Sequence, residues 1–253
     1  MPSWVLVLLV APVIGSFAGV LIRRLPEQRP VAVARSACEA CGHELGPREL
    51  VPVLSFVVQR GRCRACGEAI PPFHLWVELA AVAVAGSAVL AAWVRGGAAP
   101  GWDGGALWAT CGLGWALMAL AWIDARHFLL PDVLTLPLLL GGLAACEALE
   151  PWALQERLVG AVAGYCGLRG VALAYRALRG REGMGAGDAK LLAACGAWLG
   201  WAALPDVLLF AALAGLAAAG AMRLRGVAVG RATAVPFGPA LAAGCWAVRL
   251  WGG

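Results

Sequence analysis

Long apolar segments separated by short polar ones make up most of the chain. A helix needs about 20 mostly apolar residues to cross the hydrocarbon core of a bilayer, and most of these segments approach that length. The pattern therefore predicts an all-α, polytopic integral membrane protein of about eight transmembrane helices. The predicted helices cover residues 3–22, 74–94, 106–124, 133–149, 157–175, 189–203, 206–222 and 235–252.

The composition supports this class of protein. Charged residues make up 14% of the chain, whereas they make up about 25% of an average soluble domain. The first apolar segment, Trp4–Ile22, contains no charge and is followed by Arg23 and Arg24. A secretory signal has its basic residues before the apolar core, so we expect this segment to remain as the first transmembrane helix.

The basic residues favour one side of the predicted topology. With the N-terminus outside, they lie in the inside loops or at their edges, apart from Arg95, Arg157, Arg169 and Arg249. Because lysine and arginine favour cytoplasmic loops, this distribution predicts an outside N-terminus. It also argues against nucleic-acid binding, which would need a clustered basic face.

The long polar loop, residues 23–73, contains two Cys-x-x-Cys pairs. Cys38 and Cys41 form the first pair, Cys63 and Cys66 form the second, and a glycine follows each. Two such turns can supply the four thiolates of a tetrahedral zinc site, which would stabilise a loop with few large apolar residues. We therefore predict a small cytoplasmic domain that binds a structural Zn²⁺. Redox-active dithiols and unligated thiols are the alternatives.

Two aspartates lie at the predicted inside ends of apolar segments. Asp124 ends the third segment, and Asp188 precedes the sixth. Ionisable groups at membrane depth are costly, so they usually line a cavity, find a partner or take part in chemistry. Two facing carboxyls that share one proton form the catalytic pair of an aspartic protease. Carboxylates that only cap helices or reach the membrane surface are the alternative.

Other residues near the aspartates have expected supporting roles. Asp132 begins the fourth predicted helix, where a carboxylate can cap the helix and interact favourably with the positive end of its dipole. Lys190 could hold a nearby carboxylate ionised or extend to the interface. Glycines before Asp188 could bring backbone N–H groups close to an extended peptide, or only permit a turn. These glycines are Gly183, Gly185 and Gly187.

Short motifs follow one another along nearly the whole chain. They are Gly15-Ser-Phe-Ala-Gly19, Arg24-Leu-Pro26, Arg35-Ser-x-Cys38, Val51-Pro-Val-Leu-Ser55, Arg60-Gly-Arg-Cys63, Leu130-Pro-Asp-Val-Leu-Thr-Leu-Pro137 after Asp124, Gly183-Met-Gly-x-Gly-Asp188-x-Lys-Leu191 and Val235-Pro-Phe-Gly-Pro239. In this order they resemble the bacterial type IV prepilin leader peptidase and N-methyltransferase family. Members of this family are intramembrane aspartic peptidases with a Gly-x-Gly-Asp motif.

The resemblance implies a bifunctional enzyme of the bacterial cytoplasmic membrane. Asp124 and Asp188 match the family's catalytic pair, and the expected supporting residues are Gly185, Gly187, Lys190 and Asp132. Such an enzyme cleaves the short basic leader of prepilins and pseudopilins at the cytoplasmic face of the membrane. It then methylates the new N-terminal residue with S-adenosylmethionine, in type IV pilus assembly or type II secretion.

We expect the chain to be organised as a first transmembrane helix (1–22), a zinc-binding domain (23–73) and a seven-helix aspartic peptidase domain (74–253). Gly19 and Leu50 depart from the family pattern in the N-terminal and cytoplasmic parts. A peptidase without methyltransferase activity is therefore an alternative. A small membrane transporter and a non-catalytic assembly factor are remote alternatives. The sequence does not predict an S-adenosylmethionine site or an oligomeric state.

Overall fold

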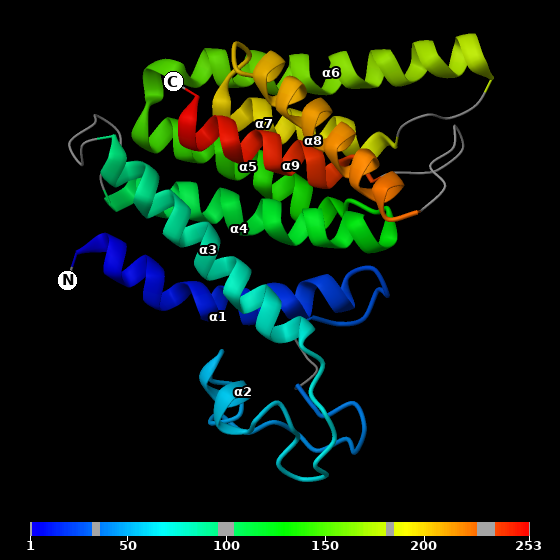
Figure 1. Cartoon of the computed structure of the whole chain (residues 1–253). Helices are drawn as coiled ribbons and strands as arrows, with labels where there is room; N and C mark the ends of the chain where they lie inside the picture. Colours follow the sequence, from blue (N-terminus) through cyan, green and yellow to red (C-terminus); the bar gives the residue numbers. More distant parts are fainter. Residues whose placement is uncertain (1, 32–35, 96–103, 181–184, 227–235, 253) are drawn as a thin grey trace.

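The computed structural model describes residues 2–31, 36–95, 104–180, 185–226 and 236–252. Within these ranges, the long helices pack into an antiparallel bundle, and a smaller loop region lies below it in Figure 1. This arrangement confirms the predicted all-α fold class. The helices are α1 (Ser3–Arg24), α2 (Leu54–Val58), α3 (Phe73–Val94), α4 (Gly104–His127), α5 (Asp132–Leu149), the 3-10 helix η1 (Pro151–Ala153), α6 (Leu154–Arg179), α7 (Ala186–Leu199), α8 (Leu204–Leu224) and α9 (Gly238–Trp251).

The lengths of the helices bear on how many of them cross the membrane. Among the described residues, six helical segments are long and apolar enough to do so, namely α1, α3, α4, α5, α6 with η1, and α8. By contrast, α7 and α9 have 14 residues each. At 1.5 Å per residue they reach about 21 Å, while the hydrocarbon core is about 30 Å thick. The polytopic class is confirmed, but the described helices do not confirm a total of eight crossings.

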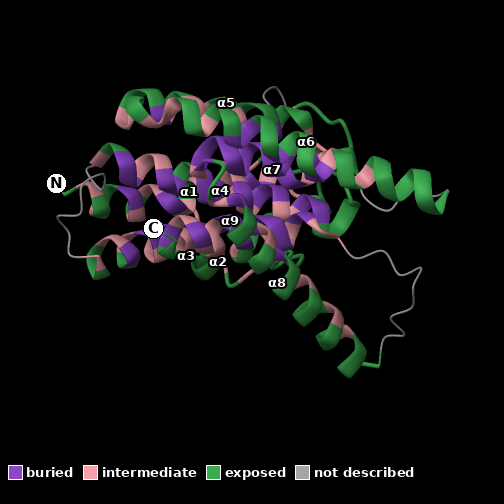
Figure 2. Cartoon of the chain, turned by 90° about the horizontal axis from the view of Figure 1, so that it is seen from above, coloured by how far each residue is buried: buried purple, intermediate pink, exposed green. Residues whose placement is uncertain are grey.

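The helix α4 lies between two groups of buried apolar residues. The first group, here called the C-terminal core, joins α4 to α5, α7, α8 and α9 and includes Leu120 and Leu241. The second group, the N-terminal core, packs α1 and α3 against α4 and includes Ala11 and Ala85. Figure 2 shows the buried residues gathered at the centre of the bundle, while the far ends of α6 and α8 are exposed. The position of α4 thus depends on both halves of the chain.

Close backbone contacts hold α7 within the C-terminal core. A Cβ added at Gly160 of α6 would lie 2.6 Å from the carbonyl oxygen of Gly196 in α7, so these helices meet where both have glycine. Small residues allow such close approach between membrane helices. Near the same end of α7, the indole N–H of Trp198 donates a hydrogen bond of 2.8 Å to the carbonyl of Leu138 in α5. These contacts fix the helix that carries Asp188.

Candidate active site and metal site

Asp124 lies in the last turn of α4, which continues to His127 instead of ending at the aspartate. The residue is buried, and its Oδ2 accepts a hydrogen bond of 2.9 Å from the backbone N–H of Gly238. Gly238 is the first residue of α9, and the N-terminal end of a helix carries partial positive charge. A second helix therefore favours negative charge on Asp124, although the C-terminal end of α4 does not.

The close approach of α9 to Asp124 requires glycine at position 238. A Cβ added there would lie 2.6 Å from Oδ2 and 2.9 Å from Cγ of Asp124, which is closer than real Cβ atoms approach such neighbours. Sequence reasoning missed this contact. The available signal was the Pro-Phe-Gly-Pro motif at 236–239, which was matched as part of a resemblance without a role for its glycine.

Asp188 is the third residue of α7 and is also buried. Its carboxylate is hydrogen-bonded to the backbone of Gly185, the N-cap residue of the helix, as in the reciprocal half of a capping box. It lies close enough to Asp124 for the two carboxylates to interact electrostatically. The fold therefore brings together two aspartates from separate helices, each near the positive end of a helix.

Lys190 and Asp132 form an ion pair beside the two buried aspartates. The Nζ atom of Lys190 lies 2.6 Å and 2.8 Å from the two carboxylate oxygens of Asp132. Of the two roles expected for Lys190, the structure favours pairing with a carboxylate. Asp132 is the first residue of α5, so its carboxylate lies at the positive end of the helix dipole as expected, but the N-cap position is occupied by Pro131 and has no side-chain cap. The carboxylate is instead held by Lys190, and the pair links α5 to α7.

The described glycines before Asp188 have different environments. Gly187 packs against the loop between α4 and α5, since a Cβ added to it would lie 3.0 Å from the Cβ of Leu130. Gly185 is exposed and has an extended backbone with φ −72° and ψ 152°. Gly183 lies outside the described residues. The small size of Gly187 thus allows the start of α7 to pack closely against the loop between α4 and α5, and neither described glycine needs a left-handed conformation.

The four cysteines of the long loop converge on one point. The sulfur atoms of Cys38, Cys41, Cys63 and Cys66 all lie within 4.8 Å of one another, and those of Cys38 and Cys66 are 3.9 Å apart. Tetrahedral zinc with Zn–S bonds of about 2.3 Å would place its sulfur ligands about 3.8 Å apart. Backbone hydrogen bonds from Cys41 and Ala40 lower the pKa of the Cys38 thiol to about 7, which favours the thiolate that a metal needs. The donor set and its spacing fit a structural Zn²⁺.

Each cysteine pair is held in a tight turn of the same form. The N–H of Gly42 donates to the carbonyl of Cys38, and the N–H of Gly67 donates to the carbonyl of Cys63, both at 2.9 Å. The two glycines have φ values of +72° and +75°, in the left-handed region that other residues rarely adopt. The glycines after the cysteine pairs therefore permit these tight turns.

Two family models and several curated relatives match the chain. The model described as the type IV leader peptidase family matches residues 111–220, and the one described as the bacterial peptidase A24 N-terminal domain matches residues 9–93. A prepilin leader peptidase/N-methyltransferase of Pseudomonas aeruginosa is 38% identical, over 97% of this chain and 89% of its own. A protein of the same name from Aeromonas hydrophila is 41% identical over 98% of this chain and 90% of its own. Another from Burkholderia pseudomallei is 42% identical over 90% of this chain and 71% of its own.

No solved structure is significantly similar to the chain. The two family models cover successive parts of the sequence, and these relatives are similar over most of its length. This protein belongs to the type IV leader peptidase family.

Proposed function

We propose that this protein is a membrane aspartic endopeptidase that removes the leader from prepilins and methylates the new N-terminus. The observation that carries the proposal is the meeting of Asp124 and Asp188, from α4 and α7, in a member of this family. The curated relatives are named prepilin leader peptidase/N-methyltransferase, which supports both activities. The protein is a multi-pass protein of the inner membrane.

The proposed chemistry uses a water molecule held between the two carboxyls. One carboxylate takes a proton from the water, which attacks the scissile carbonyl carbon while the protonated partner donates to the carbonyl oxygen. The tetrahedral intermediate then collapses as a proton passes to the leaving nitrogen. The ends of α9 and α7 stabilise the single negative charge that the pair retains, through the backbone at Gly238 and Gly185.

Leader removal by purified protein tests the catalytic pair. Asp124→Asn and Asp188→Asn should each abolish cleavage of a prepilin peptide, because an amide cannot exchange the required proton. Asp132→Asn is the matched control, since this carboxylate lies nearby but is bound to Lys190. It should retain measurable activity. Full activity in either of the first two variants would refute the assignment.

The proposed substrate is a prepilin or pseudopilin with a short basic leader followed by a long apolar helix, cleaved after the last glycine of the leader. The proposed methyl donor is S-adenosylmethionine, and we assign no residue to its site. Substrate that has been cleaved beforehand should be methylated by the Asp188→Asn variant, because methylation uses a free amine and needs no proteolysis. Loss of methylation in the folded variant would indicate one shared site. Cleavage without methylation by the wild-type protein would indicate a peptidase only.

The proposed orientation has the N-terminus outside and the aspartate pair and the zinc-binding domain (23–73) on the cytoplasmic side. The distribution of basic residues supports it, including Arg23 and Arg24 in the last turn of α1. A reporter enzyme that is active only outside the cytoplasm should be inactive when fused within residues 36–72 and active when fused between α3 and α4. The opposite pattern would reverse the proposed topology.

The proposed role of Zn²⁺ is structural. Four cysteine ligands would complete the tetrahedral coordination of the ion, so no position would remain for water or substrate. The described part of the loop between α1 and α3 has a short helix and two isolated bridges as its regular structure. A metal that joins the two cysteine turns would therefore supply much of the stability of this region.

A further inference from the structure

The short helix α2 presents an apolar face that the described protein does not cover. Leu54, Val57 and Val58 are 63%, 63% and 79% exposed, and the preceding residues Leu50 and Val51 are exposed as well. These residues belong to the loop region between α1 and α3. A cluster of exposed, large apolar side chains usually marks a surface that contacts a protein or a membrane.

A buried glutamate attaches this segment to the membrane bundle. The Oε2 atom of Glu78 in α3 accepts a hydrogen bond of 2.7 Å from the N–H of Val53, and Ser16 of α1 is hydrogen-bonded to the same carboxylate. The two long helices are in close contact here, since a Cβ at Gly15 would lie 2.7 Å from the Cα of Glu78. Glu78 is five residues beyond the start of α3 at Phe73, which corresponds to about 7.5 Å along the helix. The attachment point therefore lies inside the apolar span.

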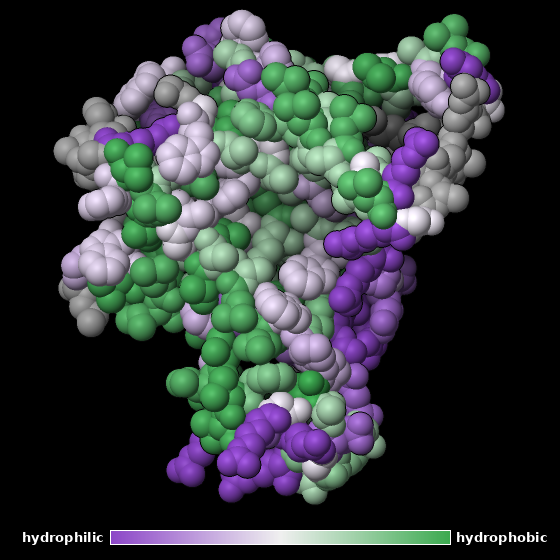
Figure 3. Space-filling view, viewed as in Figure 1, coloured by the Kyte–Doolittle hydropathy of each residue, from purple (hydrophilic) through white to green (hydrophobic). Residues whose placement is uncertain are grey.

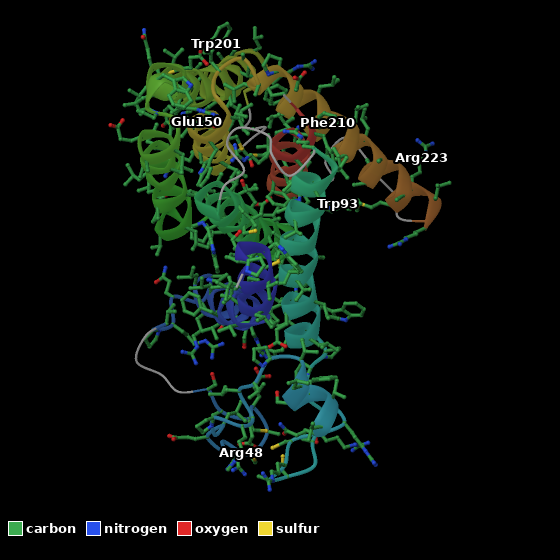
Figure 4. The ribbon with its side chains drawn as sticks, turned by 90° about the vertical axis from the view of Figure 1, so that its left-hand side faces the viewer. Arg48, Trp93, Glu150, Trp201, Phe210 and Arg223 are labelled. Atoms are coloured by element: carbon green, nitrogen blue, oxygen red, sulfur yellow. The ribbon has the colours of Figure 1, made fainter. Side chains whose placement is uncertain are left out.

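The turn at Val53 directs α2 alongside the bundle. Val53 has φ 60° and ψ −52°, and the N–H of Leu54 donates to the carbonyl of Pro52 at 2.6 Å, as in a γ-turn. This conformation is strained for a β-branched residue, and the bond to Glu78 helps to hold it. In Figure 1, α2 lies below α1 and is set back from the end where α1 and α3 join the loop region. The helix thus lies alongside α1, next to the start of α3 (Figure 4).

The exposed face of α2 is continuous with the apolar surface of the spans. Figure 3 shows hydrophobic side chains over α2 next to those over the lower part of α3, with hydrophilic atoms along the bottom edge of the loop region. Phe17 of α1 and Trp76 of α3 are also exposed on the adjacent helices. Arg60 and Arg62 follow α2 and are exposed, as suits residues that reach the headgroups from an interfacial helix.

We propose that α2 inserts into the bilayer leaflet beside α1 and α3, with Leu54, Val57 and Val58 in contact with lipid. The attachment to Glu78 within the apolar span and the continuity with the lipid-facing surface identify lipid as the occupant. The four-cysteine region then contacts lipid through the exposed face of α2, and its other side faces water. This contact does not depend on the proposed peptidase activity.

Photocrosslinking in a bilayer tests the inference. The full chain, carrying p-benzoylphenylalanine in place of Val57 or Val58, is placed in nanodiscs of phosphatidylethanolamine and phosphatidylglycerol and irradiated. Arg48 is the matched control position, because it is exposed and lies at the end of the same region that faces away from α3 in Figure 4. Mass spectrometry should detect lipid adducts at least tenfold more often at positions 57 and 58 than at position 48.

Equal or absent lipid adducts at positions 57 and 58 would overturn the proposal. Adducts to a second copy of the chain, or to an added prepilin peptide instead of lipid, would identify a protein-docking surface and also overturn it. The zinc content of each labelled protein, about one ion per chain by the four-thiolate ligand set, verifies that the region is folded.

A second experiment tests the attachment to Glu78. With p-benzoylphenylalanine at position 57, Glu78→Ala should reduce lipid adducts severalfold, because Val53 loses its acceptor. Glu78→Gln keeps an acceptor oxygen and should restore them. Unchanged adducts in a folded Glu78→Ala variant would refute the role of Glu78 in placing α2, and the comparison of positions 57 and 48 would still decide the lipid contact.

Discussion

Replacing Gly238 with alanine should disable the proposed peptidase by displacing Asp124. The new methyl carbon would lie 2.6 Å from Oδ2 and 2.9 Å from Cγ of that carboxylate. Both distances are shorter than the contacts that real Cβ atoms make, so either the carboxylate must rotate or α9 must move away. Each response breaks the hydrogen bond of 2.9 Å between the Gly238 N–H and Asp124.

The expected size of the effect follows from this hydrogen bond. A hydrogen bond to a charged group contributes about 1.5–3 kcal/mol. Since each 1.36 kcal/mol in the barrier is tenfold in rate, its loss predicts a fall in kcat of roughly ten- to a hundredfold. KM should change little, because the displaced group acts on the reacting atoms and not on the rest of the substrate.

The assay is cleavage of a prepilin peptide under conditions that give kcat and KM separately. Gly112→Ala is the matched control, because Gly112 lies in the same helix as Asp124 and a Cβ there meets no atom within 4 Å. This variant should keep wild-type kinetics. Circular dichroism and thermal unfolding should confirm that both variants are folded.

Two results would refute the reasoning about Gly238. One is a folded Gly238→Ala protein whose kcat stays within twofold of the wild type, which would mean that α9 does not position the catalytic carboxylate. The other is a rise in KM with unchanged kcat, which would place Gly238 in substrate binding. Equal losses in the Gly112→Ala control would point to a general effect on the bundle.

Three further predictions concern the metal, the ion pair and the shared proton. Cys41→Ser or Cys66→Ser should lower the zinc content from about one ion per chain to none and expose residues 36–72 to protease, whereas metal-free wild-type protein with a protected loop would contradict a structural zinc site. Lys190→Met should lower stability by at most about 1 kcal/mol, because both partners are partly exposed. A loss of activity larger than tenfold in this variant would show that the lysine acts on the catalytic pair. Peptidase activity should depend on pH in a bell-shaped manner, since one carboxyl must be protonated and its partner ionised, and a profile with a single limb would contradict a shared proton.

The apolar pattern predicted the helices well because the bilayer imposes both a length and a composition on each span. It predicted α7 and α9 less well, since a short helix surrounded by other helices is as apolar as one that crosses the membrane. The meeting of Asp124 and Asp188 followed from topology, which placed both aspartates at one end of the bundle. The tight turns of the cysteine pairs could be predicted locally, because the glycine after each pair permits a left-handed conformation.

Contacts between residues that are far apart in the sequence could not be predicted from the apolar pattern or from local motifs. The bond from Gly238 to Asp124 depends on how α9 packs against α4, and no periodicity encodes that packing. The attachment of Val53 to Glu78 joins a loop to a span in the same way. For Asp132, local reasoning predicted a helix cap, whereas the structure shows an ion pair with Lys190 of another helix.

The place of α4 between the two cores has a consequence for any division of the chain. One family model ends at residue 93, and the other begins at residue 111, after α4 has started. The sequence thus divides into two modules, whereas the fold does not, because Ala81 and Ala85 of the first module pack against α4. In a fragment that ends after α3, the face of α3 that carries Ala81 and Ala85 would contact lipid and no longer α4. The two halves should therefore resist protease only when they are expressed together, as a split protein that reassembles around α4.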